Sequence, residues 1–546
     1  MDVNLKLSRD VISTQASKSI SEVALKFNVS EATIRNWIKA KLLEVSENAE
    51  ISSASINYFA THILGKQRLN ARSNKLQKDS HDHKLLSLEL QKQIANQHDV
   101  GGLGINYESA LSESYKNQQG IYYTPEFIVQ DMTSGIEFDQ NLADKTFLDP
   151  CCGSGNFLLK AFRLGFSPEN IYGFDTDPNA VAIAKQRLFE ATGYYSEHIH
   201  VADFLAHSTQ QEKLFDYIYT NPPWGKKTSK ADKLTYSKLF NAGKSTDTAA
   251  LFFFASLATL HSGGKLGFLL PDSFFAISVF ESARKKALEC KINRLVDYKK
   301  PFKGLMTKAQ AILLTNVPAE ENHEIQCEFE DNQYTRLQQS LAQIPKSIFN
   351  FWANDNEAKV ISHILHLEHI NLANNAKWGL GIVTGNNKEF FKSESSKGLI
   401  PVYKGSDITK DGLKKPTLFI PEDLGLYQQV APAHLYQARE KIIYKFISST
   451  LCFYCDHKQR YMLNSANFLI LNTDFPIGSR ALVKLLNSDF MTWIFKSIFA
   501  SHKILRSDLE RLPIHSKYFE IYKEFNEDAY LDYLGVQKSN GTYVLK

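Results

Sequence analysis

The sequence predicts an α/β protein built around a doubly wound, Rossmann-like sheet, with further domains on either side. Two observations support this prediction. A short apolar strand, a glycine turn and an amphipathic helix follow one another between Thr146 and Arg163, and four more apolar strands follow at βαβ spacing. The chain has 546 residues, whereas single cores stop growing at about 250–300, so we expect several domains.

The N-terminal residues 19–41 have the pattern of a helix-turn-helix. An apolar face from Ile20 to Phe27 predicts the first helix, and Asn28 tolerates the left-handed conformation of a turn. Ser30 is a good N-cap for a second helix. Its inward-facing residues are Ile34, Trp37 and Ile38, and its outward-facing residues are Arg35, Asn36 and Lys39. We expect this helix to contact DNA or a partner protein, with a purely structural module as the alternative.

The following residues, 51–98, are polar with helical spacing, and the glycines of 101–104 mark a break before the next domain. A basic piece at 66–75 is typical of a solvated helix face, although a phosphate contact has the same pattern. We therefore expect a helix-turn-helix-like module at residues 1–60 and a helical linker at 61–102.

The loop Asp149–Gly155 (Asp-Pro-Cys-Cys-Gly-Ser-Gly) joins the first strand to a helix at 156–163. Its two glycines let the backbone approach a ligand closely, and the start of the helix offers unpaired N–H groups. The loop is not the dinucleotide fingerprint, which requires Gly or Ala where Leu158 stands. It predicts a small-molecule site at the carboxyl end of the sheet.

The next two strands both end in an acidic residue. Asp175 ends the strand 171–175 about 20 residues past the glycine turn, where a carboxylate can accept hydrogen bonds from ribose hydroxyls. After the strand that begins at Ile199, Asp203 can accept from an adenine amino group, with Phe204 against the ring. Either acid alone can be a helix cap, but both at βαβ spacing favour a nucleoside-containing ligand.

A segment before the glycine loop, Gly120–Pro125, predicts the start of another helix. Thr124 is the expected N-cap and Pro125 the expected first helical residue, with 126–132 following. A helix start of this kind can hold a carboxylate.

The fourth strand, 215–220, ends in Asn221-Pro222-Pro223-Trp224, which indicates chemistry on a nucleobase amine. Such an amine is a poor nucleophile because its lone pair is delocalised into the ring. The Asn221 side-chain oxygen and the Pro222 carbonyl can accept its two N–H groups and favour the tetrahedral geometry needed for attack. Both prolines stiffen the turn, and Trp224 offers a face on which an extruded base can stack. A rigid turn without a chemical role is the alternative.

In their order, the Tyr-Tyr-Thr-Pro segment, the glycine loop and the Asn-Pro-Pro-Trp turn resemble the motifs of γ-class adenine-N6 DNA methyltransferases of restriction–modification and phage-defence systems. The resemblance covers residues 103–315. It implies S-adenosylmethionine as cofactor, double-stranded DNA as substrate, and methyl transfer to a flipped-out adenine at a specific site.

The resemblance also assigns roles to single residues. The residues that it assigns to cofactor binding are Tyr123, Thr124, Pro125, Asp149, Gly153, Ser154, Gly155, Asp175, Asp203 and Phe204. Catalysis falls to Asn221, Pro222, Pro223 and Trp224, and stacking on the target base to Trp224 and Phe302. For Phe302, core packing is an equal alternative.

Trp224 departs from the Tyr or Phe that is most frequent in this family, and cytosine-N4 enzymes also favour Trp. Their first residue is usually Ser, Thr or Asp, so Asn221 favours adenine. The alternatives are a cytosine-N4 DNA methyltransferase, a methyltransferase of RNA or protein glutamine, and a DNA-binding regulator with an inactive core.

The C-terminal half departs from the βα alternation after about Pro318. Further strands are expected at 265–271, 292–298 and 309–315, the last two near the sheet edge, and then at 378–385, 400–407 and 441–446. The C-terminal region resembles the family's target-recognition domains more weakly. We expect the methyltransferase core at 103–318 and a mixed α/β target-recognition domain at 319–546.

Composition restricts the partners and the compartment. The net charge is only +4, so a nucleic-acid surface must be a local patch. Six cysteines without framework spacing indicate a reducing compartment, and neither a signal pattern nor a bilayer-spanning apolar run is present. We expect a cytoplasmic, nucleoid-associated bacterial protein without membrane contact.

Two negative predictions complete the sequence analysis. Cys452, Cys455 and His457 lack a second pair of ligands, so no metal site is expected. The sequence has no convincing nuclease signature of paired acids followed by Glu-x-Lys. Cleavage is therefore expected to belong to a separate restriction endonuclease or defence-system subunit.

Overall fold

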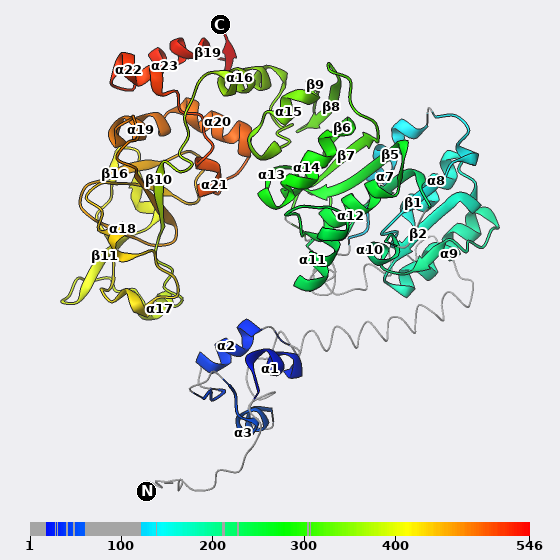
Figure 1. The fold of residues 1–546 in the computed structure, drawn as a ribbon, viewed down its shortest axis with the longest axis horizontal. Helices are drawn as coiled ribbons and strands as arrows, with labels where there is room; N and C mark the ends of the chain where they lie inside the picture. The colour runs from blue at the N-terminus through cyan, green and yellow to red at the C-terminus, as the bar shows by residue number, and fades with distance from the viewer. Residues whose placement is uncertain are drawn as a thin grey trace. The chain divides into compact units, whose positions relative to one another are not determined.

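The computed structural model describes residues 18–27, 29, 31–39, 42–46, 50–60, 122–137, 139–209, 213–225, 229–302, 305 and 307–546 (Figure 1). The chain divides into two compact units, Met1–Gln119 and Gly120–Lys546. None of the helices in the described ranges combines the length and the apolar composition that crossing a bilayer requires.

In the first unit, α1 (Ile20–Phe27) and α2 (Glu31–Lys39) confirm the two predicted helices. Each helix buries one apolar face, and α3 (Ser53–Tyr58) follows after Ser52, whose side chain accepts from Ser55 N. The core of this unit consists of Val23, Ala24, Ile34, Trp37, Leu43, Ile51, Ile56 and Phe59. The expected turn residues Asn28 and Ser30, the side chains of Asn36 and Lys39, and the expected linker at 61–102 lie outside the described residues.

The second unit contains a nine-stranded sheet of order β3-β2-β1-β4-β5-β7-β6-β8-β9. Its strands are β1 (Phe147–Asp149), β2 (Ile171–Asp175), β3 (Ile199–Val201), β4 (Phe215–Thr220), β5 (Leu260–Pro271), β6 (Lys291–Asp297), β7 (Ala309–Thr315), β8 (Glu324–Phe329) and β9 (Asn332–Leu337). The first five strands in this order run parallel, and β7 runs antiparallel to β5 and β6. The predicted doubly wound sheet is confirmed.

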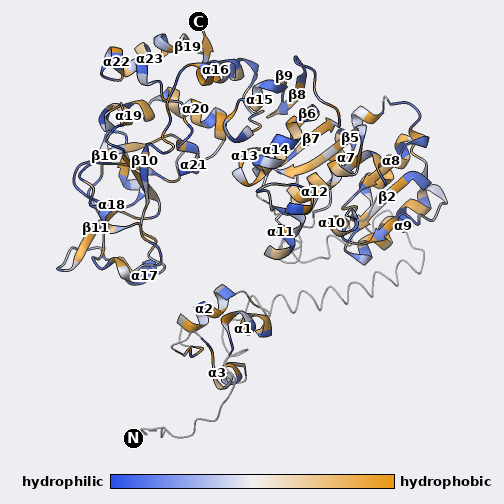
Figure 2. Ribbon diagram, viewed as in Figure 1, coloured by the Kyte–Doolittle hydropathy of each residue, from blue (hydrophilic) through white to orange (hydrophobic). Residues whose placement is uncertain are grey.

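Helices cover both faces of this sheet because its central strands are apolar on both sides. The helices are α7 (Glu126–Thr133), α8 (Asn156–Leu164), α9 (Pro178–Thr192), α10 (Phe204–His207), α11 (Lys230–Leu239), α12 (Thr248–Ala258), α13 (Ser273–Ala276) and α14 (Glu281–Leu288). Phe147 and Tyr217 face the cluster with α7, α8 and α9, whereas Leu148 and Ile218 face the cluster with α10, α12 and α14. In Figure 2 the central strands of the sheet and α12 are largely orange, as burial on both faces requires.

The far side of the sheet differs from the sequence prediction. β7 inserts between β5 and β6, and the edge is formed by β8 and β9 beyond residue 318. A loop without a described helix joins β6 to β7, so the chain returns directly and the two strands pair antiparallel. The β8–β9 hairpin turns at Glu330 and Asp331, both with positive φ. Its strands alternate polar and apolar residues, a pattern that differs from the continuous apolar strands of βα units, so the sequence did not predict them.

The C-terminal region is a mixture of small sheets and helices. A four-stranded sheet has the order β10-β18-β15-β16, a three-stranded sheet the order β14-β11-β17, and β12–β13 and β19–β20 form hairpins. The strands are β10 (Ala376–Leu380), β11 (Leu399–Tyr403), β12 (Ile408–Thr409), β13 (Gly412–Leu413), β14 (Leu418–Pro421), β15 (Lys441–Lys445), β16 (Phe453–Asp456), β17 (Tyr461–Met462), β18 (Ala466–Leu471), β19 (Val536–Ser539) and β20 (Thr542–Leu545). The helices are α15 (Gln338–Ala342), α16 (Asp355–His366), α17 (Asn387–Phe390), α18 (Ala433–Tyr436), α19 (Ser479–Leu486), α20 (Asp489–Phe499), α21 (Arg506–Leu509), α22 (Ser516–Tyr522) and α23 (Glu527–Leu534). The three strands expected here exist, although each ends before its expected last residue.

Candidate active site

The sheet order brings the candidate site residues to one edge. β1 lies between β2 and β4 and runs parallel to both, so the loops that follow these three strands leave the sheet side by side. Two of these loops contain the glycine turn and the Asn-Pro-Pro-Trp turn, and Asp175 is the last residue of β2. Small ligands bind at such a position in doubly wound sheets, where the strand order reverses.

The loop after β1 is held by hydrogen bonds at two points. Gly153 N donates to Asp175 Oδ2 at 2.9 Å, and Arg187 Nη1 donates to the Ser154 carbonyl at 2.7 Å. Gly153 and Gly155 have φ angles of 50° and 89°, and a Cβ on Gly155 would lie 3.1 Å from a side-chain atom of α9. The positive φ favours glycine at both positions, and at Gly155 the space for a side chain is also tight, so the predicted tight turn is confirmed.

Asp149 connects the end of β1 to the end of β4. Its carboxylate is 2% exposed and accepts from Thr220 Oγ1 at 2.6 Å and from Cys151 N at 3.0 Å. Burial outweighs these hydrogen bonds and, with the charge of Asp175, raises the pKa of Asp149 to about 7. Asp149 therefore fixes the glycine loop against the residue that directly precedes Asn221.

Asp203 and Phe204 lie in different environments. Asp203 is exposed and caps α10, because its Oδ1 accepts from Leu205 N at 3.0 Å. Phe204 is 1% exposed, and its ring centroid lies 5.6 Å from that of Phe174 and 6.2 Å from that of Phe252. The helix cap named as an alternative is present, and a contact of Phe204 with a ligand stays a prediction.

The Asn221 side chain is fixed through its nitrogen. Nδ2 donates to the carbonyl of Tyr122 at 2.9 Å. Oδ1 is buried and has no hydrogen-bond partner among the described residues. A buried acceptor without a partner is rare and costs about 1–3 kcal/mol. Tyr122 thus orients the amide so that its oxygen is available to an incoming N–H group.

Three aromatic rings gather beside this amide. The ring centroid of Phe302 lies 5.4 Å from that of Trp224, at 84°, and 5.6 Å from that of Tyr122. Trp224 Nε1 donates to the Leu269 carbonyl at 3.3 Å, which fixes the indole. A base between two parallel rings needs them about 7 Å apart, twice the contact distance of carbon atoms. Phe302 must therefore move before a base can lie between it and Trp224.

The segment before α7 approaches the same site. Asn156 Nδ2, at the start of α8, donates to the Thr124 carbonyl at 2.9 Å. α7 begins at Glu126, so Pro125 is its N-cap and Thr124 precedes the cap. The expected helix start is therefore wrong by one residue, because the ψ of Pro125 is 145°, an extended value.

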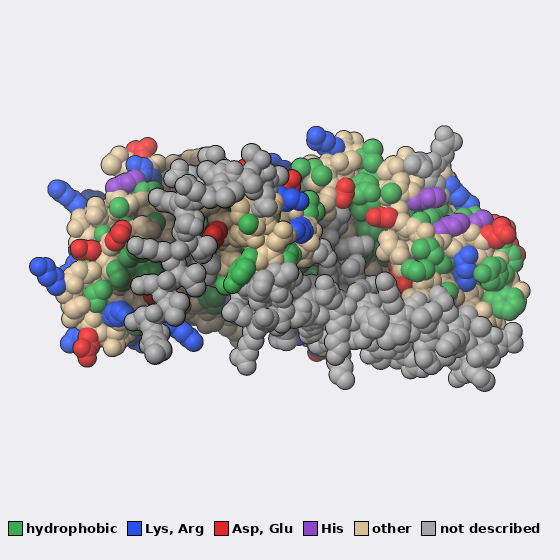
Figure 3. All heavy atoms as spheres, turned by 90° about the horizontal axis from the view of Figure 1, so that it is seen from below, with side chains coloured by type: hydrophobic (Ala, Val, Ile, Leu, Met, Phe, Trp, Pro, Cys, Tyr) green, Lys and Arg blue, Asp and Glu red, His purple; other side chains and the backbone are tan. Residues whose placement is uncertain are grey.

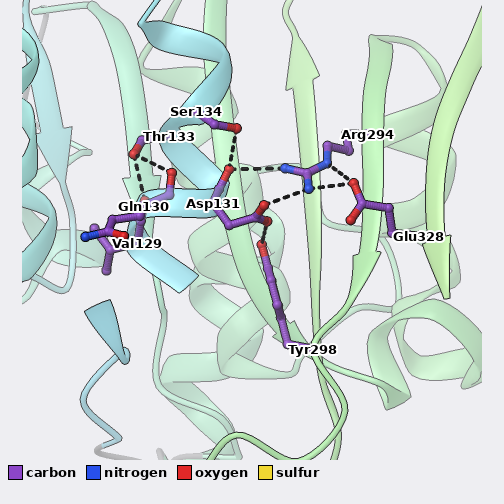
Figure 4. Close-up of polar contacts among 8 residues, drawn as sticks. All are labelled: Val129, Gln130, Asp131, Thr133, Ser134, Arg294, Tyr298 and Glu328. Atoms are coloured by element: carbon purple, nitrogen blue, oxygen red, sulfur yellow. Dashed lines mark hydrogen bonds and ion pairs between the residues drawn. The ribbon is translucent and has the colours of Figure 1, made fainter. Parts of the chain in front are cut away.

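A partly buried ion cluster holds α7 against the sheet (Figure 4). Arg294 of β6, 15% exposed, pairs with Asp131 of α7 at 2.8 Å and donates to Glu328 of β8 at 2.6 Å. Tyr298 donates its hydroxyl to the second oxygen of Asp131. Burial and the charge of Asp131 raise the pKa of Tyr298, so the hydroxyl keeps the proton that it donates.

Four residues of this region were not predicted from the sequence: Tyr122, Asp131, Arg294 and Glu328. Arg294 is 163 residues from Asp131 and 34 from Glu328, so no local spacing connects them. One signal was present, because an arginine within an apolar strand must find partners for its charge.

Charged side chains do not mark a DNA surface on the face drawn in Figure 3. On the face in Figure 3, Lys and Arg side chains of the described residues stand among Asp and Glu side chains and form no continuous basic field. Because the net charge is +4, a DNA surface on this chain has to be local.

Two family models match this chain. Residues 98–376, about half of the chain, match the N-6 DNA Methylase family, and residues 400–514 match the TaqI-like C-terminal specificity domain. The first match contains the whole of the site described above, and the second contains β12 to β18 and all of β11 except Leu399.

Individual relatives agree with these matches. The type II methyltransferase M.VspI of Vibrio sp. (strain 343) is 46% identical over 395 residues, which are 72% of this chain and 96% of that protein. The modification methylase CviBIII of Paramecium bursaria Chlorella virus NC1A is 25% identical over 217 residues, 39% of this chain and 54% of that protein. The structure of the type IIL restriction–modification enzyme MmeI in complex with DNA has the same fold, with a TM-score of 0.51 at 12% identity over 75% of this chain and 70% of that one.

The sheet order and the convergent loops agree with these matches, which favour the predicted N6 chemistry over the alternatives. The chain belongs to the N-6 DNA methylase family: it is an S-adenosylmethionine-dependent, adenine-specific DNA methyltransferase of the restriction–modification type, with a C-terminal target-recognition domain.

Proposed function

We propose that the enzyme methylates the N6 amine of an adenine turned out of the duplex, with Asn221 as the central catalytic residue. The buried Asn221 Oδ1, which lacks a partner among the described residues, supports this proposal most strongly. This oxygen accepts one N–H of the adenine amine, and the Pro222 carbonyl accepts the other. Both hydrogen bonds draw the lone pair out of conjugation with the ring. Trp224 and Phe302 stack on the base, and Pro223 keeps the turn rigid.

The residues after β1, β2 and β3 fit S-adenosylmethionine. The glycines of the loop leave room for a ligand beside the backbone, and two acidic side chains lie at the ends of neighbouring strands. Asp175 accepts from the ribose hydroxyls, and Asp203 and Phe204 hold the adenine. The remaining cofactor-binding residues are Tyr123, Thr124, Pro125, Asp149, Gly153, Ser154 and Gly155. When bound, the cofactor supplies a methyl group on a sulfonium, which is a good leaving group.

Domain boundaries follow from the packing. β8 and β9 belong to the sheet of the core, and Leu341, Phe349 and Phe351 belong to one of its hydrophobic clusters. We therefore propose that the core extends from about 103 to about 351, with the target-recognition domain after it. The helix-turn-helix module at 1–60 and the linker at 61–102 precede the core. DNA cleavage belongs to a separate restriction endonuclease or defence-system subunit.

The experiment that tests the proposed function is methyl transfer from radiolabelled S-adenosylmethionine to unmethylated genomic DNA, followed by long-read mapping of the product. We expect N6-methyladenine within one sequence motif. Label in N4-methylcytosine would contradict the adenine assignment. Label transferred to RNA or protein but not to DNA would contradict the DNA substrate.

Loosening α7 is expected to weaken cofactor binding. In Asp131→Asn the ion pair with Arg294 is lost, and α7 and the segment before it are no longer fixed against β6. We expect the Kd for S-adenosylmethionine, measured by isothermal titration calorimetry, to rise about tenfold, which corresponds to about 1.4 kcal/mol.

The matched control is Glu126→Gln on the same helix. The pair of Glu126 with Arg163 is exposed on both sides, and such pairs contribute about 0–1 kcal/mol. We expect the control to stay within about twofold of the wild type. Equal Kd values for Asp131→Asn and the wild type would show that the cluster does not position the cofactor segment.

Cofactor affinity is expected to depend on pH through Asp149. Its pKa of about 7 means that the carboxyl is mostly protonated below pH 7 and ionised above it. The cofactor carries positive charge, so binding favours the ionised form, and affinity rises with pH. Between about pH 5.5 and about pH 7.5 we expect the Kd to fall by up to about tenfold per pH unit in the wild type. In Asp149→Asn the Kd should be independent of pH in this interval; an unchanged slope in this variant would assign the effect to another group.

A further inference from the structure

Strand pairing in the C-terminal region brings three metal-ligating side chains to one place. β15 pairs antiparallel with the edge strand β16, with Lys441 opposite Asp456. Glu440 directly precedes β15, His457 directly follows β16, and Cys455 lies two residues before His457. The paired strand ends therefore bring these three side chains close together.

The distances within this group suit one metal ion. Cys455 Sγ lies 3.4 Å from His457 Nε2, and Glu440 Oε2 lies 3.4 Å from the other ring nitrogen, Nδ1. One ion takes only one of these two nitrogens, so the carboxylate or the ring must shift when the ion binds. One ligand atom from each residue can be chosen so that all three lie within 4.8 Å of one another. In a tetrahedral zinc site two ligand atoms are about 3.4–3.6 Å apart, given metal–ligand distances of about 2.0–2.3 Å. Within the described ranges this is the one group of three such residues.

A buried ion cluster on the other face of the hairpin holds the group in place. Asp456 accepts from Lys441 Nζ at 2.9 Å and from Arg460 Nη1 at 2.6 Å, and Arg460 N also donates to it. These contacts fix the chain directly before and after His457. A ligand set on a fixed backbone loses less conformational freedom when a metal binds.

We propose that Glu440, Cys455 and His457 bind one zinc ion, with the fourth position filled by water. A thiolate, an imidazole and a carboxylate together select zinc over magnesium or calcium, which prefer oxygen ligands only. The ion links the end of β16 to the start of β15 and so stabilises the edge of the specificity domain. Binding displaces the thiol proton of Cys455, and this proton goes to solvent.

From sequence no metal is expected here, because Cys452 and Cys455 with His457 lack a second pair of ligands. Cys452 points to the other side of the sheet, where its Sγ lies 3.8 Å from the Ile408 carbonyl. The third ligand, Glu440, comes from the neighbouring strand, and its contribution is visible only through the strand register.

The test uses the full chain, freed of metal with a chelator and titrated with Zn²⁺ against a chromophoric zinc indicator. We expect one equivalent to bind with a Kd below about 10 µM, and Cys455→Ser and His457→Gln to bind at least about 100-fold more weakly. Cys290→Ser is the matched control, because it removes another free thiol outside the site and should leave the affinity unchanged. A wild-type chain without this equivalent, or a Cys455→Ser chain that retains it, would overturn the proposal.

A second measurement on the wild-type chain avoids variants that fail to fold. Cys455 is partly exposed, so a thiol reagent should alkylate it in the metal-free chain. One equivalent of Zn²⁺ should slow alkylation of the Cys455 peptide by at least about tenfold, and should leave the partly exposed Cys151 unaffected. Equal rates for Cys455 with and without Zn²⁺ would exclude the thiolate as a ligand.

Discussion

Replacing Asn221 by alanine is expected to lower kcat for methyl transfer by about 100- to 1,000-fold, the usual effect of losing one preorganised polar contact to a transition state. The Asn221 amide is held through Nδ2 by the Tyr122 carbonyl, and its Oδ1 lacks a partner in the described chain. Without this oxygen the adenine amine keeps one N–H unpaired, and the Pro222 carbonyl alone must favour the tetrahedral geometry. The measurement is single-turnover transfer of radiolabelled methyl to a DNA duplex with the mapped site.

The same variant should bind S-adenosylmethionine with a Kd within about twofold of the wild type, because in the proposed function Asn221 contacts the acceptor base and not the cofactor. Asn170→Ala is the matched control. Asn170 also donates from its amide to a backbone carbonyl, that of Ala143, but at an exposed position outside the site. A loss of kcat of less than tenfold in Asn221→Ala would show that methyl transfer does not depend on this oxygen.

Local patterns in the sequence were sufficient to predict the site elements that depend on short spacing. The turn of Gly153 and Gly155, the end of β2 at Asp175 and the end of β4 before Asn221 all lie within single βα units. The sequence also predicted that these elements lie close together, because the carboxyl ends of parallel strands meet at the same edge of a sheet. Phe302 is different: family resemblance alone suggested it, and the structure places its ring beside Trp224.

Contacts between distant parts of the chain could not be predicted. The hydrogen bond from Asn221 to the Tyr122 carbonyl joins residues 99 positions apart, and it uses a backbone acceptor that every residue possesses. The ion pair between Arg294 and Asp131 forms because β6, which lies next to β8 in the sheet, also packs against α7. Such contacts follow from the order of the strands in the sheet. That order depends on packing between distant parts of the chain, which a short stretch of sequence does not reveal.

The second large effect is expected at the ion cluster around Asp456, where Asp456→Ala should lower the free energy of unfolding of the C-terminal region by about 3–5 kcal/mol. The side chains of Lys441 and Asp456 are both 0% exposed. Burial lowers the pKa of Lys441 despite its partner. Burial acts to raise the pKa of Asp456, but hydrogen bonds from Arg460 and Lys441 outweigh it and hold that pKa below its usual value. Removing the carboxylate therefore leaves a fully buried ammonium without its counter-charge.

The measurement is amide hydrogen exchange of β15 and β16 as a function of urea, which reports on this region separately from the core. Lys441→Met alone should lower the free energy of unfolding by less than Asp456→Ala, because Arg460 still pairs with Asp456 at 2.6 Å.

The double variant Lys441→Met/Asp456→Leu should recover most of the lost free energy of unfolding, since apolar residues of similar volume replace a buried pair with little loss of stability. A double variant as unstable as Asp456→Ala would show that the hydrogen bonds of Asp456 to the Arg460 backbone carry the stability. If the double variant regains its stability but binds the mapped DNA site more weakly, the ion cluster serves to fix residues 457–460 and the shape of the specificity domain.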